Sequence, residues 1–594
     1  MKKAFILIFL KLSILCFALS FDEEDKVILR QEQRLEQERL EREFKNRKES
    51  SKNLKFEEIE ENVNEDEIKF QILNIFLKDD EELLNEIEKE RILTKYLRKD
   101  LGSTDIANLL AELTNRLITK GYITTVASIS QDNDLTRKQL NIEIIPGRIE
   151  KILLNENGNL DNIKKFFLFK SKAGDVLNIK DLDTATDNFN YLEANNMSME
   201  IIPSEKPNYS VIKVSNQMKE KFTLSFLTNN HGEDRQNAIW RYGGSINIDS
   251  PLGVGDRLYF SYMTVHKKKP DRSWKKSTNV LKPGEILPIG PKGYDPSKGD
   301  ILPYKRELDL YNLRYILKYH EYSLTLSSSR TEKESSFYTG NTIYDFSTIS
   351  DTFSVNLDKI LWRNQKSKLS LGVGLKKRHN KNYLETATLY DRVLSIGDIS
   401  LDGSTVFWRG LLSASLGYER GLRALGAESD KGKIATTPKS EFNKYTLNIN
   451  YYKPIQQKLV YRLNLSATHS NDVLYSSEKQ SIGGVGSVGG YHRTGAIQGD
   501  KAIEIENEFS YRLVNSEKIG NLSPYISYSY GAVNNNKNYS KYAKGYMSGA
   551  TIGLRYNMKY FDFDIAYAKP LAHSNYLNPK NREIYFSAGI KIKF

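Results

Sequence analysis

From about residue 221 to the C-terminus, apolar and polar residues alternate with a period of two. In segment 459–467 the odd positions are Leu459, Tyr461, Leu463, Leu465 and Ala467. The even positions include Arg462, Asn464 and Ser466. Such alternation is typical of β-strands with two different faces. A soluble sandwich would have to bury every apolar face in one core, and this stretch has no helical partner. We therefore expect an all-β transmembrane barrel, whose apolar faces meet lipid and whose polar faces meet a wet lumen.

The connections between the expected strands are of two kinds. Short turns such as 364–367 and 454–457 alternate with long polar loops such as 267–306. Bacterial barrels place short turns in the periplasm and long loops outside the cell. A spanning strand takes about 9–11 residues, and residues 218–594 have room for about 14–16 strands, a number that must be even. The expected location is the outer membrane, in contact with its lipid.

The last residues of the chain carry a second barrel signal. One face of the final strand holds Ile584, Phe586, Ala588, Ile590, Ile592 and Phe594. The ending Ser587-x-Gly589-x-x-Ile592-x-Phe594 resembles the C-terminal recognition signal of outer-membrane barrels. We expect Gly589, Ile592 and Phe594 to form this signal and the barrel-assembly machinery to insert the chain.

Residues 1–20 have the composition of a secretory signal peptide. Lys2 and Lys3 precede an apolar stretch that ends with the small residues Ala18 and Ser20. A lipoprotein signal is not favoured, because the residue before Cys16 is not small. Cys16 is the only cysteine, so a chain cleaved after residue 20 could form no internal disulfide.

Residues 21–45 are dense in Glu, Gln, Arg and Lys and favour a helix. Their apolar residues are too sparse for a coiled-coil seam. Two interpretations remain at this point: a solvated or disordered leader, and a polar helix that sits in a polar cavity. Residues 46–66 are rich in Lys, Asn, Ser and Glu and are expected to form a linker.

Residues 67–217 change to the pattern of two small α+β domains, 67–150 and 151–217. Helical spacing of apolar residues predicts a helix in the first domain, with Ser103 as N-cap and Gly121 as C-cap. In the second domain, Asn178 is the expected N-cap of a helix. The expected strands are Tyr122–Ile129, Leu140–Ile145, Met199–Ile202 and Val211–Val214.

No pattern for catalysis or for a cofactor is visible. The seven histidines are scattered without the spacing of a helical zinc site, and a chain without mature cysteine is a poor candidate for structural zinc. Gly484-x-Gly486-x-x-Gly489 matches a dinucleotide fingerprint only formally, because no βαβ unit surrounds it. The net charge of +12 is spread along the chain without a basic stripe. We expect no enzyme, no cofactor, no metal and no nucleic-acid partner.

The same glycine-rich segment, 481–494, still needs an explanation. Five glycines within residues 483–490 permit positive φ angles and a close approach to a wall. The segment is either a flexible external hairpin or an ordered loop that folds back into the lumen.

The residues around this loop resemble the two-partner secretion (type Vb) transporters, the outer-membrane exporters of haemolysins and filamentous adhesins. The resemblance rests on Ser477 to Gly484, Ser487-Val488-x-Gly490-Tyr491, Gly499-Asp500 and Asn507-Glu508. It extends to Gly147-Arg148-Ile149-Glu150, Gly174-Asp175-x-Leu177-Asn178, Ser250 to Asp256 and Gly417 to Leu422. Each match is weak by itself, but their order and spacing together are specific.

The resemblance implies a barrel of 16 antiparallel strands, two periplasmic POTRA domains and an N-terminal helix that plugs the pore. It implies export of a large exoprotein without ATP, captured by strand addition to a POTRA sheet edge. The candidate cargo-binding residues are Tyr122, Ile123, Val126, Ile201 and Ile202. The implied lumen-loop motif is Ile482, Gly483, Gly484, Ser487, Val488, Gly489, Gly490, Tyr491 and Arg493. An outer-membrane protein assembly factor of the same superfamily is the alternative.

One departure from the family pattern concerns the loop tip. The family reads Val-Arg-Gly-Tyr or Val-Arg-Gly-Phe where this chain has Val488-Gly489-Gly490-Tyr491. The acidic partner on the facing strand is also missing, where this chain has Ser527, Ser529 and Gly531. We therefore expect Gly489 and Ser529 to be neighbours, and Gly489→Arg with Ser529→Asp to rebuild a charged pair in part. Arg493 is a second candidate for the latch.

Overall fold

The computed structural model describes residues 68–154, 161–217, 219–232, 240–265, 306–339, 342–364, 366–456, 458–491, 496–516, 519–536 and 543–594. Within those ranges, no helix combines the length and the apolar character that a membrane span requires. The expected signal peptide (1–20), plug helix (21–45) and linker (46–66) lie outside the described residues, as does Arg493.

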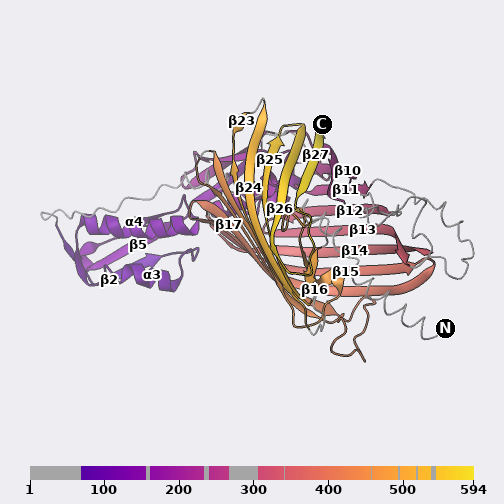
Figure 1. The fold of residues 1–594 in the computed structure, drawn as a ribbon. Coiled ribbons are helices and arrows are strands. Elements are labelled where there is room, and N and C mark those ends of the chain that lie inside the picture. The colour runs from indigo at the N-terminus through magenta and orange to yellow at the C-terminus, as the bar shows by residue number, and fades with distance from the viewer. Residues whose placement is uncertain are drawn as a thin grey trace, which may run out of the picture.

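The first α+β domain packs helices against a small sheet and lies at one end of the molecule (Figure 1). Its elements are β1 (Phe70–Ile72), β2 (Asn74–Lys78), α3 (Glu86–Leu93), β3 (Lys99–Leu101), α4 (Ser103–Lys120), β4 (Val126–Ile129) and β5 (Gln139–Ile145). The main sheet has the order β2-β5-β4, and one face of α4 buries Leu109, Leu113 and Leu117 in the core.

Two local expectations for this domain need correction. The N-cap of α4 is Gly102, whose N–H donates to the Asp105 carboxylate at 2.9 Å, so Ser103 is the first helical residue. Gly121 is the C-cap, as predicted, with φ of 108°. The strand expected from Tyr122 begins only at Val126, because the chain is still turning at Thr125, whose N–H bonds Tyr122 O at 3.3 Å.

The second α+β domain has the elements β6 (Arg148–Leu154), α5 (Asp161–Leu168), α6 (Ile179–Asn190), β7 (Met197–Pro203) and β8 (Tyr209–Asn216). Its sheet order is β6-β8-β7, and Asn178 caps α6 as predicted. Residues 148–150 were expected to end the first domain. They instead begin β6, which pairs in parallel with β8, so the second domain begins after Gly147.

Each of the two small domains packs a side chain against the hydrophobic core of the other. Val176 of the second domain packs on the core of the first, and Ile123 of the first packs on the core of the second. Tyr122 also packs on the first core. Tyr122 and Ile123, expected on a cargo-binding strand, therefore belong to this junction.

Sixteen antiparallel strands close into a barrel, as expected (Figure 1). They are β9 (Phe222–Asn229), β10 (Arg241–Asp249), β11 (Arg257–Val265), β12 (Arg306–Tyr319), β13 (Tyr322–Thr339), β14 (Thr342–Arg363), β15 (Ser367–Leu384), β16 (Ala387–Phe407), β17 (Gly410–Leu422), β18 (Asn443–Pro454), β19 (Leu459–His469), β22 (Lys501–Tyr511), β24 (Gly520–Asn534), β25 (Lys544–Asn557), β26 (Phe561–His573) and β27 (Glu583–Lys593). A short strand, β23 (Val514–Ser516), pairs only with β24 at the periplasmic end.

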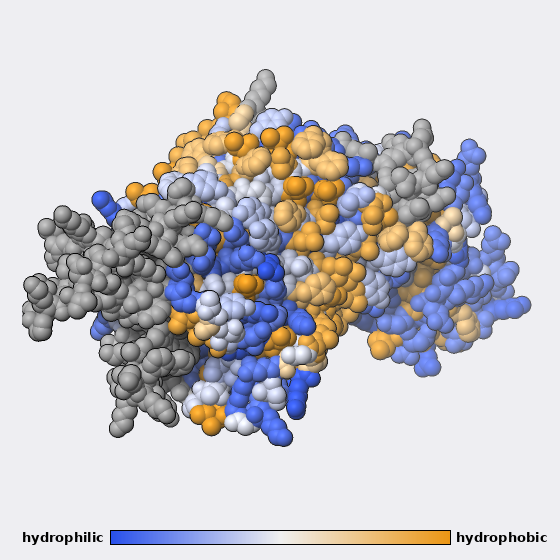
Figure 2. Space-filling view, turned by 90° about the vertical axis from the view of Figure 1, so that its right-hand side faces the viewer, coloured by the Kyte–Doolittle hydropathy of each residue, from blue (hydrophilic) through white to orange (hydrophobic). Residues whose placement is uncertain are grey.

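Alternate residues of the barrel strands face lipid and lumen, as the period of two predicts. On β26, Ile565 and Tyr567 are exposed on the outer face, whereas Ala566 and Ala568 are buried. Apolar residues accordingly gather over the barrel strands in Figure 2. Inside, Glu508 of β22 pairs with Arg462 of β19 at 2.9 Å and with Arg555 of β25 at 3.2 Å, so the lumen wall is polar.

The barrel closes between its first and last strands. β27 pairs with β9 from Ser587–Asn229 to Lys593–Thr223, and this seam includes Gly589 and Ile592 of the expected C-terminal signal. Phe594 exchanges two backbone hydrogen bonds of 3.0 Å with Phe222, and their rings stack at 6.0 Å.

The second α+β domain is docked on one part of the periplasmic rim. Arg363, at the end of β14, pairs with Asp187 of α6 at 2.9 Å. Asn188 of α6 donates to the carbonyl of His320, in the β12–β13 turn, at 2.6 Å. Asp249, at the β10–β11 turn, accepts from Ala194 N at 2.9 Å. Three turns therefore hold the domain at the mouth of the barrel.

Candidate functional site: a loop folded into the barrel lumen

The segment between β19 and β22 folds back into the lumen instead of extending outside. It contains a short hairpin, β20 (Gln480–Ile482) with β21 (Ile497–Gly499). Ile482, Val488 and Tyr491 are fully buried and form one apolar cluster with Met547 of β25 and with neighbouring wall residues. The ordered-loop interpretation is therefore correct for the described part of this segment.

Hydrogen bonds within the turn give the loop tip its shape. Gly483 N–H donates to Ser487 Oγ at 2.9 Å, and Gly484 N–H donates to Val488 O at 3.0 Å. These two bonds satisfy backbone groups that burial removes from water. The tip is thus a compact structured turn that can press against the wall.

The tip is fastened to the wall by neutral hydrogen bonds. Gly489 N–H donates to Ser529 Oγ of β24 at 3.3 Å, so the expected neighbours are in contact. Gly490 N–H donates to Tyr585 Oη of β27 at 2.7 Å, and the Tyr585 hydroxyl donates to Glu583 at 2.7 Å. These contacts occupy the place of the charged pair of the family pattern.

Tyr491 adds a buried anchor beside them. Its hydroxyl lies 2.9 Å from Ser548 O on β25 and 3.1 Å from Ala572 O on β26, and donates toward both. Its ring meets the His573 ring edge-on at 6.2 Å. A buried hydroxyl that lost such acceptors would cost about 1–3 kcal/mol. Tyr491 therefore fixes the position of the loop tip against the barrel wall.

Glycines on the wall make this close approach possible. A Cβ at Gly549 would lie 2.0 Å from the backbone oxygen of Gly489, and a Cβ at Gly531 would lie 2.3 Å from Ile482 Cγ2. Real Cβ atoms do not approach that closely. Gly531 thus contributes to the site by having no side chain. Ser527 is buried on the same wall face, one step closer to the periplasm than Ser529.

Charged groups hold the other end of the loop. Glu478, 2% exposed, accepts from Arg378 of β15 at 2.9 Å and lies 3.4 Å from Lys444 of β18. Lys444 pairs in turn with Glu419 of β17 at 2.9 Å. Buried charges persist when they are paired in this way, and removal of one partner is costly. The loop therefore spans the lumen from a charged anchor on β15–β18 to a neutral anchor on β24–β27.

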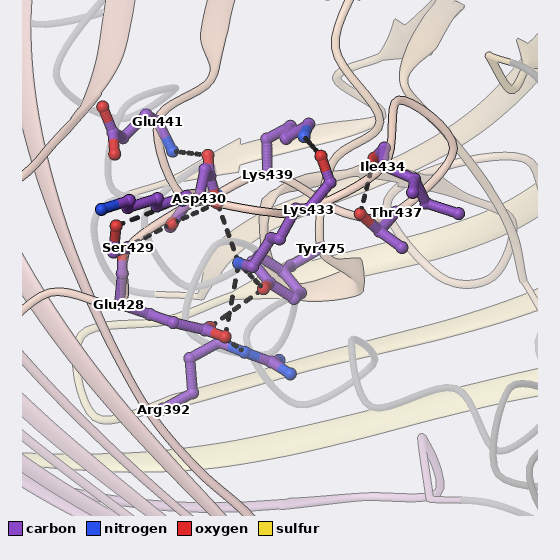
Figure 3. A network of polar contacts seen from close by, with 12 residues as sticks. Arg392, Glu428, Ser429, Asp430, Lys433, Ile434, Thr437, Lys439, Glu441 and Tyr475 are labelled. Atoms are coloured by element: carbon purple, nitrogen blue, oxygen red, sulfur yellow. Dashed lines mark hydrogen bonds and ion pairs between the residues drawn. The ribbon is translucent and has the colours of Figure 1, made fainter.

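Residues of the external loops and of the strand β16 form a polar cluster next to this anchor (Figure 3). We define the clasp as Arg392, Glu428, Asp430, Lys433 and Tyr475. Glu428 accepts from the Tyr475 hydroxyl at 3.0 Å and from Arg392 at 3.2 Å. Lys433 donates to Tyr475 Oη at 2.9 Å and to Asp430 at 2.8 Å. These contacts join the β17–β18 loop to the base of the lumen loop.

Asp430 is the centre of the clasp. Its carboxylate accepts from Ser440 N at 2.9 Å, from Ser440 Oγ at 2.6 Å and from Glu441 N at 2.8 Å. Burial alone would raise its pKa, but the hydrogen bonds from Lys433, Ser440 and Glu441 hold the pKa of this carboxyl well below its usual range. Asp430 is therefore ionised at neutral pH.

The sequence predicted the loop but not the residues that hold it against the barrel wall. Arg378 and Glu478 are 100 positions apart, and Gly490 and Tyr585 are 95 apart. No local pattern connects such residues. The absence of the usual Arg and Asp was the one available signal that the latch had changed.

The two candidate cargo-binding strands lie at sheet edges. Val126 is exposed on β4, the edge of the first sheet, and Ile202 is exposed on β7, the edge of the second. Ile201 is half-buried and packs on the second core. The expected edge strands are thus present, without Tyr122 and Ile123.

A family model described as haemolysin secretion/activation protein ShlB/FhaC/HecB matches residues 208–556. The chain belongs to this family. Models of the POTRA domain match residues 70–147, as the ShlB type, and residues 148–203. The ShlB/FhaC/HecB assignment confirms the resemblance seen in the sequence. It makes the chain an outer-membrane β-barrel of a transporter family, and the two α+β domains are its POTRA domains.

Individual relatives support the ShlB/FhaC/HecB assignment. Outer membrane transporter CdiB of Dickeya dadantii (strain 3937) is 26% identical over 510 residues, 86% of this chain and 84% of that protein. Hemolysin transporter protein HpmB of Proteus mirabilis is 23% identical over 489 residues, 80% of this chain and 78% of that protein. The solved structure of CdiB from Escherichia coli has a TM-score of 0.81 at 20% identity, over 96% of this chain and 99% of that chain, which shows the same fold.

Proposed function

We propose that this protein captures an unfolded partner exoprotein in the periplasm and passes it through the barrel lumen to the cell surface. The observation that carries the proposal is the open edge of β7, in the POTRA domain that is docked at the mouth of a polar barrel. The family assignment favours this function over the assembly-factor alternative. The chain contains no nucleotide-binding motif, so folding of the exported chain outside would supply the driving force.

The hydrogen bonds at the ends of the β7–β8 ladder show which peptide groups of β7 point away from the sheet. Ser204 N bonds Tyr209 O at 3.0 Å, and Gln217 N bonds Asn196 O at 3.3 Å. In an antiparallel ladder, bonded residues alternate with residues whose groups point outward. Even-numbered residues of β7 therefore bond β8, and the odd-numbered residues face the open edge.

Both ends of this edge are closed to an added strand. At one end, Asn190 accepts from Met197 N at 2.6 Å and donates to Met197 O at 2.9 Å. At the other end, Pro203 has no N–H to offer. Among the described residues, Met199 and Ile201 remain as the open peptide groups. An added cargo strand would gain up to four main-chain hydrogen bonds there.

The edge of β4 is a poorer acceptor for a strand. Ala127 N–H, which points away from β5, already donates to Thr114 Oγ1 of α4 at 3.1 Å. The strand is also short, with four residues. We therefore assign cargo capture to β7 with Ile201 and Ile202, and leave Val126 a secondary role.

The remaining parts follow from the same model of export. Residues 1–20 would direct the chain out of the cytoplasm, residues 21–45 would occupy the resting lumen, and residues 46–66 would tether them to the POTRA domains. The barrel-assembly machinery would insert the barrel into outer-membrane lipid. Family members are transporters and not enzymes, and we assign no catalytic step to this chain.

Ile201→Pro tests the assignment of cargo capture to β7. It removes one outward N–H and leaves the hydrogen bonds to β8 in place, because Ile201 and Ile212 form a non-hydrogen-bonded pair of the ladder. We expect secretion of the cognate exoprotein to fall severalfold, measured in the medium of cells with equal levels of barrel in the outer membrane. Ile201→Ala, which loses the same half-buried side chain but keeps the N–H, is the matched control. Unchanged secretion by Ile201→Pro would refute capture at this edge.

A further inference from the structure

The periplasmic rim of the barrel is covered unequally. The second POTRA domain contacts the β10–β11, β12–β13 and β14–β15 turns. We call the other four turns, β16–β17, β18–β19, β22–β24 and β25–β26, the open rim. Each of these turns carries an exposed large apolar residue. They are Trp408, Ile455, Leu513, Ile519, Met558 and Tyr560.

The open rim is also basic. Arg409, Lys458 and Lys559 are exposed in its turns, and Lys453 lies at the end of β18. None of the described residues in these four turns is acidic, from 408 to 409, 455 to 458, 512 to 519 and 558 to 560. The charged side chains among the described residues of these turns are therefore all basic, and Glu517 of the β22–β24 turn lies outside the described residues.

The β16–β17 turn contains the centre of this surface. Trp408 and Arg409 have φ of 44° and 59°, a conformation that side-chain-bearing residues seldom adopt and that Asn-Gly usually supplies in such hairpins. The Tyr451 hydroxyl donates toward Phe407 O and Trp408 O, each at 3.2 Å. Lys453 Nζ lies 3.7 Å from the centre of the Trp408 ring. The turn thus holds an indole that is 73% exposed beside two cations.

We propose that the open rim binds anionic phospholipid headgroups of the periplasmic leaflet, centred on Trp408, Arg409 and Lys453. Guanidinium and ammonium groups bind phosphate, and Trp prefers the membrane–water interface. The bilayer is the favoured occupant because the wall directly above is lipid-facing. Phe407 and Tyr511 are exposed there at the end of the barrel strands. This inference does not rest on the proposed export function.

Quenching of a single tryptophan by brominated lipid tests the site. The chain has four tryptophans, so Trp240, Trp274 and Trp362 are changed to Phe and Trp408 is kept. The full chain is placed in phosphatidylcholine vesicles that contain a minor fraction of brominated phosphatidylglycerol or brominated phosphatidylcholine. Basic residues near a membrane attract anionic lipid about fivefold each. We therefore expect a preference of at least about fivefold for phosphatidylglycerol at Trp408.

Two comparisons decide the outcome. The variant Arg409→Gln with Lys453→Gln should bring the preference to about one, that is, no preference. Inorganic phosphate should compete no better than chloride at equal ionic strength. Equal quenching by both lipids, a preference that survives loss of both cations, or specific competition by free phosphate would overturn the proposal.

Discussion

Gly489 faces β25 and not the strand with which it shares a hydrogen bond. A Cβ on Gly489 would lie 2.4 Å from Thr551 Oγ1 and 3.4 Å from Ala568 Cβ. An Arg side chain there would begin against Thr551, although Gly489 N is 3.3 Å from Ser529 Oγ. The prediction that Gly489→Arg with Ser529→Asp would rebuild the charged pair in part therefore also requires the Thr551 side chain to move aside.

Gly549→Ala should release the loop tip. The new methyl would overlap the backbone oxygen of Gly489, and overpacking of this kind costs about 1–3 kcal/mol. Because the contact lies between loop and wall, we expect the barrel to stay closed while the loop undocks. Planar-bilayer recordings should show larger or more frequent openings than in the unchanged protein.

Gly244→Ala is the control for this change. A Cβ at Gly244, on β10, would come no closer than 3.4 Å to its nearest neighbour, Ser225 O. It should leave conductance unchanged. Gly549→Ala channels that are indistinguishable from this control would mean that the tip does not restrict the lumen.

The strands themselves were predictable, because alternation is a property of consecutive residues and fixes which face of each strand meets lipid. The start of β4 was not predictable from the sequence, because the turn at Thr125 depends on packing at the POTRA junction. The clasp was also not predictable from the sequence, because Arg392, Glu428 and Tyr475 come from three separate segments of the chain. Contacts of this kind form only when distant strands are brought into register.

The clasp should respond to pH in one direction. The folded pKa of Asp430 is depressed, so its contribution is complete above the usual Asp value of about 3.9 and is lost as pH falls through the folded value. Asp430→Asn should weaken the clasp by on the order of 1–2 kcal/mol. Trypsin should then cut faster at Lys431 and Lys433 near neutral pH.

Glu441→Gln is the control, because it removes the same charge from the same loop at an exposed side chain. Hydrogen exchange extends the comparison to acid. The difference between Asp430→Asn and the unchanged chain should be constant from neutral to mildly acidic pH and disappear only in strong acid. A difference that grows as pH falls would contradict the role given to Asp430.

At the scale of the whole molecule, export requires a continuous route. The POTRA domains share core residues at their junction, and the second one is hydrogen-bonded to three turns of the barrel. The second POTRA domain, which carries β7, is thus held at the periplasmic rim of the barrel. The loop spans that lumen, and its neutral tip can leave the wall without stranding a buried charge. The route would open by movement of the loop.

Photo-crosslinking at two adjacent residues of β19 tests this route most directly. Asn464 lies on the lumen face, 3.4 Å from Glu506, and Leu463 lies on the lipid face. A photo-reactive amino acid is placed at either position in cells in which the cognate exoprotein is stalled during secretion. The account predicts that Asn464 captures the exoprotein and Leu463 does not. Capture at Leu463, or equal capture at both positions, would contradict export through the lumen.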